Sequence, residues 1–258
     1  MNNFLQNIKL FVLDLDGVLY IGNKIVPEAI ELVSYLRKYY KIAFFSNTSG
    51  KTSLQICEKL NRLGFICTKD EVFTASSSTA IYLKENNIDN VFVIGSDHFI
   101  NEIECKGITV IHNEHADAVV VGLDTEFNYA KIEIALSILL RGEKFIACNK
   151  DSYFPIGKNK YLPGCGAMVG AISNIVSKEP DFIVGKPNTY ILEKISEAYK
   201  VTNKEMVVVG DSYESDIRMA LNYNCKSIFI NKNGYKSKET VSLKNLSEML
   251  FFLKNNKE

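Results

Sequence analysis

The sequence has no excess of charge of either sign. Its 258 residues include 30 lysines and arginines and 30 aspartates and glutamates, with no long block of like charge. We therefore do not expect a basic surface for nucleic acid or for an anionic membrane. The expected partner is a small molecule, with no nucleic acid and no membrane, and the sequence leaves a homo-oligomer open.

Paired cysteines and long hydrophobic runs are also missing. The 6 cysteines lie far apart without a C-x-x-C pair, which argues against a zinc site and against a secreted scaffold held by disulfides. No window approaches about 18 uninterrupted apolar residues, the length of a membrane-spanning helix. The N-terminal stretch MNNFLQNIKLFVLDLD has no long apolar segment and reaches an acidic residue at Asp14, so it does not resemble a signal peptide. We expect a cytoplasmic protein with reduced thiols.

What the sequence does contain is a regular alternation of short β-rich runs and amphipathic helical patterns. Such alternation predicts an α/β fold with a parallel sheet between layers of helices. No internal repeat or low-complexity linker interrupts it. The expected strands are 8–14, 42–46, 90–95, 118–123, 181–185, 206–211 and 226–230, and the expected helices are 27–39, 52–63, 128–140, 188–199 and 214–222.

The first strand, in FVLDLDGVLY, ends on two aspartates followed by a glycine. Asp14 and Asp16 would repel each other in a half-buried place unless hydrogen bonds or a cation compensated them. Oxygen ligands favour Mg²⁺ or Ca²⁺ over zinc. The spacing does not fit a calcium loop, because glycine stands at the fourth position and isoleucine stands where the closing glutamate belongs. An ordinary Asp-Gly turn remains the alternative for this motif taken alone.

A second carboxylate pair follows another strand. In VVVGDSYESDI the β-rich run stops at Gly210, Asp211 comes next, and Asp216 lies close to the start of a helix. Taken alone, Asp211 could serve as a helix cap. Because ligands of open parallel sheets bind beyond the carboxyl ends of the strands, both aspartates are candidates for the same site as Asp14.

Two further expected strand ends carry polar groups. FFSNTSG presents Ser46 and Asn47, and IVGKPNTY places Lys186 between a glycine and a proline. Each alone could be turn chemistry or a solvated lysine. Together with the aspartates they supply carboxylates that can act as acid and metal ligands, a hydroxyl, an amide and a cation, and independent turns would rarely assemble such a complete set for one reaction.

These segments resemble the four motifs of the haloacid dehalogenase-like hydrolase superfamily. They occur in the family's order as DLDGV, FSN, GKP and GDSYESD. The segments ADAVVVGLDTEFNYAKIEIAL, FIACNKDSYFP and LPGCGAMVGAI are similar to subclass IIA, which contains p-nitrophenyl phosphatases and nucleotide or sugar phosphatases. The resemblance implies a Rossmann-like parallel sheet core, residues 1–80 and 180–258, with an inserted α/β cap domain, residues 81–179.

The resemblance also implies a role for each motif residue. The enzyme would be a magnesium-dependent phosphatase that hydrolyses a small phosphate monoester, of the nucleotide or sugar phosphate type, through an aspartyl phosphate. A phosphotransferase or mutase with the same core, or a non-catalytic sensor of a phosphorylated metabolite, are the alternatives. The implied roles are nucleophile for Asp14, general acid and base for Asp16, charge stabiliser for Lys186, phosphate binding for Ser46 and Asn47, and Mg²⁺ binding for Asp14, the Asp16 carbonyl, Asp211 and Asp216.

We expect substrate selection to reside in the insertion. CNKDSYFP and GKNKYLPGCG combine polar, aromatic and turn residues in the composition of a recognition loop. Asn149 and Asp151 are the candidate substrate-binding residues there, together with Tyr153. A surface hairpin is the alternative, because glycine, proline, asparagine and lysine also form ordinary turns.

Overall fold

A computed structural model describes residues 4–157, 160–234 and 237–256. The chain forms two compact units. The core unit comprises the described residues of Met1–Ser46, Cys57–Phe73 and Lys186–Glu258. The inserted unit comprises Asn47–Ile56 and the described residues of Thr74–Gly185.

The core unit contains a six-stranded sheet. Strand β1 pairs in parallel with both β13 and β4, and β14 pairs in parallel with β13 and β15. Every residue of β1 and of β13 is buried, which agrees with their continuous apolar sequences and is typical of central strands in a parallel sheet. The strand order is β15 (Val241–Leu243), β14 (Lys226–Ile230), β13 (Met206–Gly210), β1 (Leu10–Asp14), β4 (Lys41–Ser46) and β5 (Val72–Thr74).

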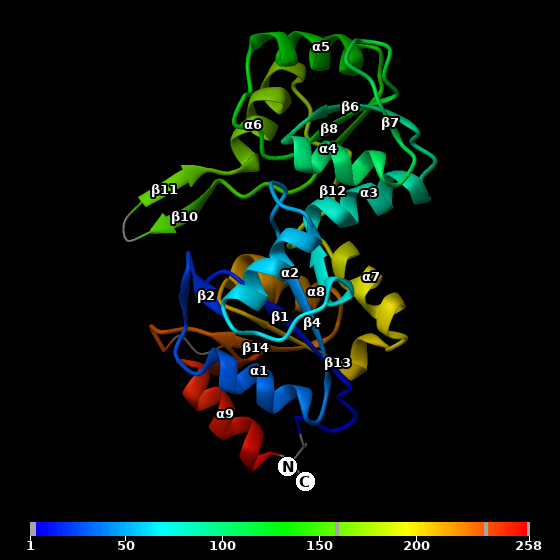
Figure 1. The fold of residues 1–258 in the computed structure, drawn as a ribbon. Helices are drawn as coiled ribbons and strands as arrows, with labels where there is room; N and C mark the ends of the chain where they lie inside the picture. Colours follow the sequence, from blue (N-terminus) through cyan, green and yellow to red (C-terminus); the bar gives the residue numbers. More distant parts are fainter. Residues whose placement is uncertain (1–3, 158–159, 235–236, 257–258) are drawn as a thin grey trace. The chain divides into compact units, whose positions relative to one another are not determined.

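Helices cover the sheet of the core unit (Figure 1). Residues of α7 and α8 pack with alternate residues of β1 such as Leu10 and Val12 in one buried apolar cluster. Helices α1 and α9 contact each other and lie side by side in Figure 1. The helices with residues in the core unit are α1 (Ala29–Arg37), α2 (Ser53–Arg62), α7 (Tyr190–Tyr199), α8 (Arg218–Asn222) and α9 (Leu246–Asn255), with short helical turns at Lys69–Glu71, Asn203–Glu205 and Tyr213–Ile217 and a small hairpin of β2 (Tyr20–Ile21) and β3 (Lys24–Ile25).

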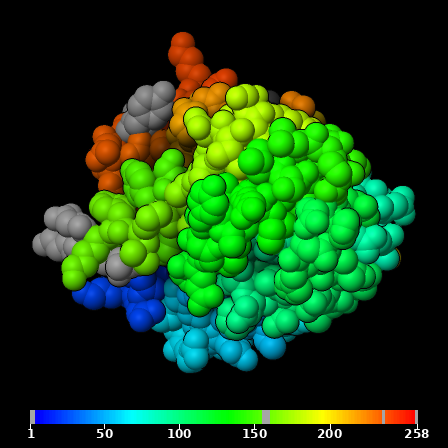
Figure 2. Space-filling model, turned by 90° about the horizontal axis from the view of Figure 1, so that it is seen from above, coloured from blue at the N-terminus to red at the C-terminus, as the bar shows by residue number. Residues whose placement is uncertain are grey.

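The inserted unit contains a sheet of its own, with five parallel strands. Helices α5 and α6 bury their apolar residues against this sheet in one cluster. Figure 2 shows the green part of the chain, which includes α5, as a continuous rounded surface. The strand order is β12 (Phe182–Ile183), β9 (Lys144–Ala147), β8 (Ala118–Val121), β6 (Asn90–Ile94) and β7 (Thr109–Val110), and the helices are α3 (Ala75–Glu85), α4 (Asp97–Glu104), α5 (Tyr129–Leu140) and α6 (Cys165–Val176).

An antiparallel hairpin lies between β9 and α6 along the chain. It consists of β10 (Tyr153–Gly157) and β11 (Lys160–Pro163), with an irregularity in the register between Pro155 and Gly157. This hairpin contains most of the predicted recognition segments. Residues 158–159 of those segments lie outside the described residues.

The predicted fold class, an α/β parallel sheet core with an inserted α/β domain, is confirmed. The bounds of the inserted unit differ from the expected 81–179 for two reasons. Helix α3 packs on α4 and therefore belongs to the inserted unit. Strand β12 pairs with β9 and belongs to the same unit. The strand expected at 181–185 is therefore shorter and does not join the core sheet. No helix within 4–157, 160–234 and 237–256 has the length and apolar character needed to cross a membrane.

Candidate active site

Three of the predicted site residues lie at the carboxyl edge of the core sheet. Asp14 is the last residue of β1 and pairs in register with Phe45 of β4, so Ser46 lies one residue further along the neighbouring strand. On the other side of β1, Leu13 is level with Val209, and Asp211 follows directly after β13. The sheet therefore brings these side chains to one edge, as the sequence predicts.

Lys186 joins two carboxylates in the interior of the core unit. Its Nζ donates to Oδ1 of Asp14 at 2.7 Å and to Oδ1 of Asp216 at 2.6 Å, and it lies 4.6 Å from the centroid of the Phe45 ring. Burial by itself lowers the pKa of Lys186, but the two carboxylates outweigh this effect and raise the pKa well above its ordinary value. Lys186 therefore carries a fixed positive charge.

The chain reaches the position of Lys186 differently from the prediction. The sequence predicts that Lys186 ends a strand of the same sheet as Asp14. The preceding strand, β12, instead pairs with β9 of the inserted unit, and Lys186 is the first residue after the chain returns to the core unit. Two short apolar strands look alike in sequence, and only their pairing shows which sheet each belongs to.

Asp14, Asp211 and Asp216 form a cluster of carboxylates. One oxygen of each lies within 4.8 Å of the others. Burial raises the pKa of Asp14 well above its usual range, Lys186 opposes this shift, and the other two carboxylates add to it. The pKa of Asp211 is raised to about 6, first by loss of hydration around the carboxyl group and then by the charge of Asp216. The residue as a whole still has exposed surface. Three carboxylates against one ammonium leave an excess of negative charge that suits a hard divalent cation.

Both carboxylate oxygens of Asp216 accept hydrogen bonds. Oδ1 accepts from Lys186, and Oδ2 accepts from the backbone N–H of Ser212 at 3.0 Å. Asp216 itself lies in the helical turn Tyr213–Ile217 and is almost fully buried. Its clearest contribution is thus to hold Lys186 beside Asp14, while exposed Asp211 can present an oxygen directly to a cation.

Gly17 allows the first motif to approach Asp211 closely. Its φ of 95° lies in the left-handed region that favours glycine, and a Cβ at this position would fall 1.9 Å from Oδ2 of Asp211. No other residue type fits here without moving the carboxylate. The glycine that follows the paired aspartates therefore serves the geometry of the cluster.

Asp16 is exposed and is not a member of the carboxylate cluster. The hydroxyl of Tyr20 donates to its Oδ2 at 3.4 Å, and Tyr20 itself has no exposed surface. Burial, followed by the charges of Asp16 and Asp14, raises the pKa of Tyr20 well above its ordinary value, so the hydroxyl keeps its proton. Sequence reasoning missed this contact because an aromatic residue in an apolar run is read as core.

In the inserted unit, the predicted phosphate-binding residue Asn47 contacts both predicted substrate-binding residues. Its Nδ2 donates to the two carboxylate oxygens of Asp151 at 2.9 and 3.1 Å. Asn149 donates from Nδ2 to the carbonyl of Asn47 at 2.6 Å and accepts the backbone N–H of Asp151 at 3.0 Å. The structure thus brings Asn47 together with two residues that lie 102 and 104 positions later in the sequence. Their binding of substrate stays a prediction.

The nearby hairpin exposes aromatic side chains. Tyr153 is 64% exposed and Tyr161 is 58% exposed, and their rings meet edge to face with centroids 5.1 Å apart. Exposed aromatic pairs of this kind can contact a ligand or a partner. The predicted role of Tyr153 in substrate selection stays a prediction.

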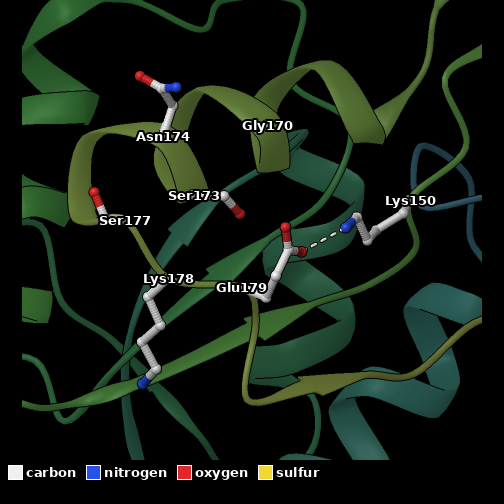
Figure 3. A pocket seen from close by; sticks show the side chains of 7 residues that line it. All are labelled: Lys150, Gly170, Ser173, Asn174, Ser177, Lys178 and Glu179. Atoms are coloured by element: carbon white, nitrogen blue, oxygen red, sulfur yellow. Dashed lines mark hydrogen bonds and ion pairs between the residues drawn. The ribbon is translucent and has the colours of Figure 1, made fainter.

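A pocket elsewhere in the inserted unit does not match the chemistry of a phosphate site. It has a volume of about 400 Å³ and lies beside α6, as Figure 3 shows. Lys150 forms an ion pair with Glu179 at 2.5 Å across it, and Lys178 pairs with Asp181 at 2.7 Å. Because both lysines already have acidic partners, this pocket lacks the uncompensated positive charge that a phosphoryl dianion requires.

Models of known families match two segments of the chain. A model of haloacid dehalogenase-like hydrolases matches residues 11–109, and a model of HAD-hydrolase-like proteins matches residues 183–248. An acid sugar phosphatase of Staphylococcus saprophyticus is 31% identical over 244 residues, which cover 94% of this chain and 93% of the relative. The chain therefore belongs to the haloacid dehalogenase-like hydrolases.

Solved structures place the chain more narrowly within this family. A p-nitrophenyl phosphatase from Archaeoglobus fulgidus superposes with a TM-score of 0.86 at 27% identity, covering 95% of this chain and 98% of the other. A 4-nitrophenylphosphatase from Thermotoga maritima gives a TM-score of 0.87 at 28% identity, covering 95% and 97%. The resemblance to subclass IIA is confirmed, and the chain is a phosphatase of this family.

Proposed function

We propose that this phosphatase is magnesium-dependent, forms an aspartyl phosphate on Asp14, and hydrolyses a small phosphate monoester. The observation that carries the proposal is the position of Asp14, which accepts a hydrogen bond from Lys186 and lies in one cluster with the carboxylates of Asp211 and Asp216. A nucleophilic carboxylate, a fixed cation and a cation-binding cluster are the groups that this chemistry needs. The relatives named acid sugar phosphatases favour a sugar phosphate as the substrate class.

Asp14 would act as the nucleophile. A phosphate monoester repels an incoming anion, so attack requires positive charge on the phosphoryl oxygens. Lys186, 2.7 Å from Oδ1 of Asp14, is placed to supply such charge beside the attacking group. The Ser46 hydroxyl, at the adjacent strand end, and the Asn47 amide are the proposed donors to the equatorial oxygens of the phosphoryl group.

The residues at the edge of the sheet fit a magnesium ion. Carboxylates of Asp14 and Asp211, with the main-chain carbonyl of Asp16, would hold it, and Asp216 would support them through Lys186. Bound there, Mg²⁺ would neutralise charge on the phosphoryl oxygens and orient them for in-line transfer. All these protein donors are oxygen atoms, as this ion prefers, and the remaining positions would be left for water and substrate.

Asp16 would act twice. As the phosphorus–oxygen bond of the ester breaks, protonated Asp16 gives its proton to the leaving alkoxide. The resulting carboxylate then takes a proton from the water that attacks the aspartyl phosphate, which releases phosphate and regenerates Asp14. The exposure of Asp16 suits both exchanges, because the group must reach the leaving oxygen and then water.

We also propose that the inserted unit selects the leaving group. In this proposal the residues of the four motifs contact the phosphoryl group. The remainder of the substrate therefore requires contacts with other residues. The exposed Tyr153 and the segment that contains Asn149 are the candidates for these contacts, whereas Asp151, which accepts two hydrogen bonds from Asn47, would act on the substrate through that residue.

The decisive experiment is a measurement of inorganic phosphate release with Mg²⁺ and no added acceptor. The panel contains p-nitrophenyl phosphate, nucleotides, sugar phosphates, phosphoglycolate and pyridoxal phosphate, with Asp14→Asn as the negative control. Hydrolysis of a monoester supports the proposal. Phosphate transfer only when a second hydroxyl compound is present would indicate a phosphotransferase or mutase. Thermal stabilisation by a phosphorylated metabolite without turnover would indicate a sensor.

A further inference from the structure

We propose that the pocket beside α6 is a second binding site, and that its ligand is a small zwitterion of the α-amino acid type. The pocket lies within the inserted unit and has a volume of about 400 Å³, which falls in the usual range for a small-molecule site. None of its lining residues belongs to the proposed catalytic or metal-binding set, so the inference goes beyond the proposed function. The lining residues that carry it are Lys150, Gly170, Ser173, Ser177, Lys178 and Glu179.

The charges that line the pocket balance each other. Lys150 and Glu179 form an ion pair with 2.5 Å between Nζ and Oε2, drawn as a dashed line in Figure 3. Lys178 is paired with Asp181, whose Oδ2 also accepts the backbone N–H of Phe145. A ligand with a net charge would leave one charge in excess at this site. The pocket therefore favours a ligand whose own charges cancel.

The ion pair between Lys150 and Glu179 can open at little cost. The two side chains are 41% and 72% exposed, and ion pairs in contact with water contribute little to stability. An α-amino acid carries a carboxylate and an ammonium group on the same carbon atom. It can pair its carboxylate with Lys150 and its ammonium group with Glu179, so that each charge of the protein keeps an opposite partner.

The carboxyl end of α6 adds to the preference for an ammonium group on the Glu179 side. Helix α6 ends at Val176, Ser177 is its C-cap, and Glu179 follows two residues later. The last carbonyl groups of a helix carry partial negative charge, which attracts a cation. This orients the ligand, with its ammonium group toward Glu179 and its carboxylate toward Lys150.

Ser173 supplies a hydrogen-bonding group that the protein does not use. Its hydroxyl is buried and has no hydrogen-bond partner among the described residues. Figure 3 shows its side chain pointing from α6 in the direction of Glu179. A buried hydroxyl without a partner is costly, and this one can turn to a ligand by rotation about a single bond. A polar ligand in the pocket thus gains a hydrogen bond without displacing an existing one.

The segment that contains Lys150 connects the pocket to Asn47. Asn149 and Asp151, on either side of Lys150, both form hydrogen bonds with Asn47. The backbone N–H of Gly166, in the first turn of α6, donates to the carbonyl of Asp151 at 2.9 Å. A ligand that binds Lys150 therefore acts on the segment that holds Asn47. This consequence, unlike the binding itself, rests on the proposed function, in which Asn47 binds phosphate.

Isothermal titration calorimetry with the full chain tests the binding. The probes are the common amino acids, one at a time, and glucose. Each amino acid that binds is compared with its N-acetyl derivative, which lacks the ammonium group, and with its amide, which lacks the carboxylate. We expect at least one amino acid to bind with a Kd of about 1 mM or tighter and both derivatives to bind about 10-fold more weakly. Binding of no amino acid, or equal binding of a derivative or of glucose, would overturn the proposal.

Gly170→Leu should block the site. No atom of the described residues lies within 4 Å of a Cβ built at Gly170, so the new side chain enters the pocket without a clash, and leucine favours a helix more than glycine does. We expect the Kd to rise about 10-fold or more. Ser137→Leu is the matched control, because it adds the same side chain at an exposed position of α5. This control should leave the Kd unchanged.

Lys150→Met and Glu179→Gln provide a second pair of variants, which also serves if Gly170→Leu does not fold. Each removes one charge that the zwitterion is proposed to pair with, so each should raise the Kd about 10-fold or more. An unchanged Kd in both variants would place the bound amino acid elsewhere on the protein and overturn the proposal.

The link to Asn47 is tested by enzyme kinetics. A saturating amino acid should change kcat/KM for the preferred phosphate ester by about 5-fold or more in the wild type and should have no effect on Gly170→Leu. Binding without such a change would overturn the link and leave the binding site standing. Failure of every amino acid to bind would overturn the inference and leave the proposed phosphatase function intact. Absence of hydrolysis by the wild type would overturn the proposed function without affecting binding measured by calorimetry.

Discussion

The amide of Asn47 donates to both carboxylate oxygens of Asp151, at 2.9 and 3.1 Å. This contact changes what a substitution at Asp151 should do. A residue that touched only the leaving group would affect large substrates alone. A residue that orients Asn47, a proposed phosphate-binding donor, should affect every phosphate ester, because the phosphoryl group is common to all of them.

We therefore expect Asp151→Ala to lower kcat/KM on small and large esters alike, by about 10-fold or more, since a hydrogen bond to a charged group contributes about 1.5–3 kcal/mol. Tyr153→Ala is the control from the same segment, and its effect should be confined to large esters because its side chain is 64% exposed and meets the ring of Tyr161. Measurement of both variants on a small and a large ester checks this. A loss with Asp151→Ala on large esters alone would instead favour direct contact with the leaving group.

Asp14→Asn should abolish turnover and leave the protein folded. The amide keeps the size of the side chain but is a far weaker nucleophile, and Lys186 retains Asp216 as a partner. Activity, circular dichroism and the mass of acid-quenched enzyme after exposure to substrate are the measurements. The wild type should show a phosphorylated species and the variant should not. A phosphorylated Asp14→Asn protein or near-normal turnover would refute Asp14 as the nucleophile.

Removal of divalent metal should stop activity. Mg²⁺ should restore it, whereas Ca²⁺ should not, because calcium prefers more ligands and looser geometry than in-line transfer tolerates. Asp211→Ala should raise the Mg²⁺ concentration needed for half-maximal activity or abolish activity. Asp216→Asn should be milder on this measure, because both oxygens of Asp216 already accept hydrogen bonds from the protein. Full activity after exhaustive chelation would exclude a metal requirement.

Gly17→Ala should damage the proposed metal site, and Gly22→Ala should not. Both glycines have positive φ, 95° and 62°, so either substitution introduces backbone strain of about 1 kcal/mol or more. Only at Gly17 would the new Cβ meet Asp211, whereas nothing lies within 4 Å of a Cβ at Gly22. The comparison uses thermal unfolding and the Mg²⁺ dependence of activity. Equal Mg²⁺ requirements in the two variants would show that Gly17 serves the turn alone.

Local sequence was enough to predict the α/β class and much of the core site. Strands β1, β4 and β13 are buried and apolar along nearly their whole length, so their ends were recognisable, and Asp14, Ser46 and Asp211 follow from those ends. Helices α3, α4, α6 and α9 were missed by the periodicity analysis. Helix α3 illustrates the reason, since its sequence ASSSTAIYLKE buries small polar residues instead of a clear apolar stripe.

The sequence by itself determined which residues end the buried strands, because continuous apolar character and the polar residue after it are local properties. Tertiary structure alone decided which distant groups these residues meet. Lys186 reaches Asp14 after a strand of the other sheet, Asp151 bonds Asn47 across about a hundred positions, and Tyr20 turns its hydroxyl toward Asp16. Such contacts depend on strand pairing and loop closure, which bring side chains together irrespective of their separation along the chain.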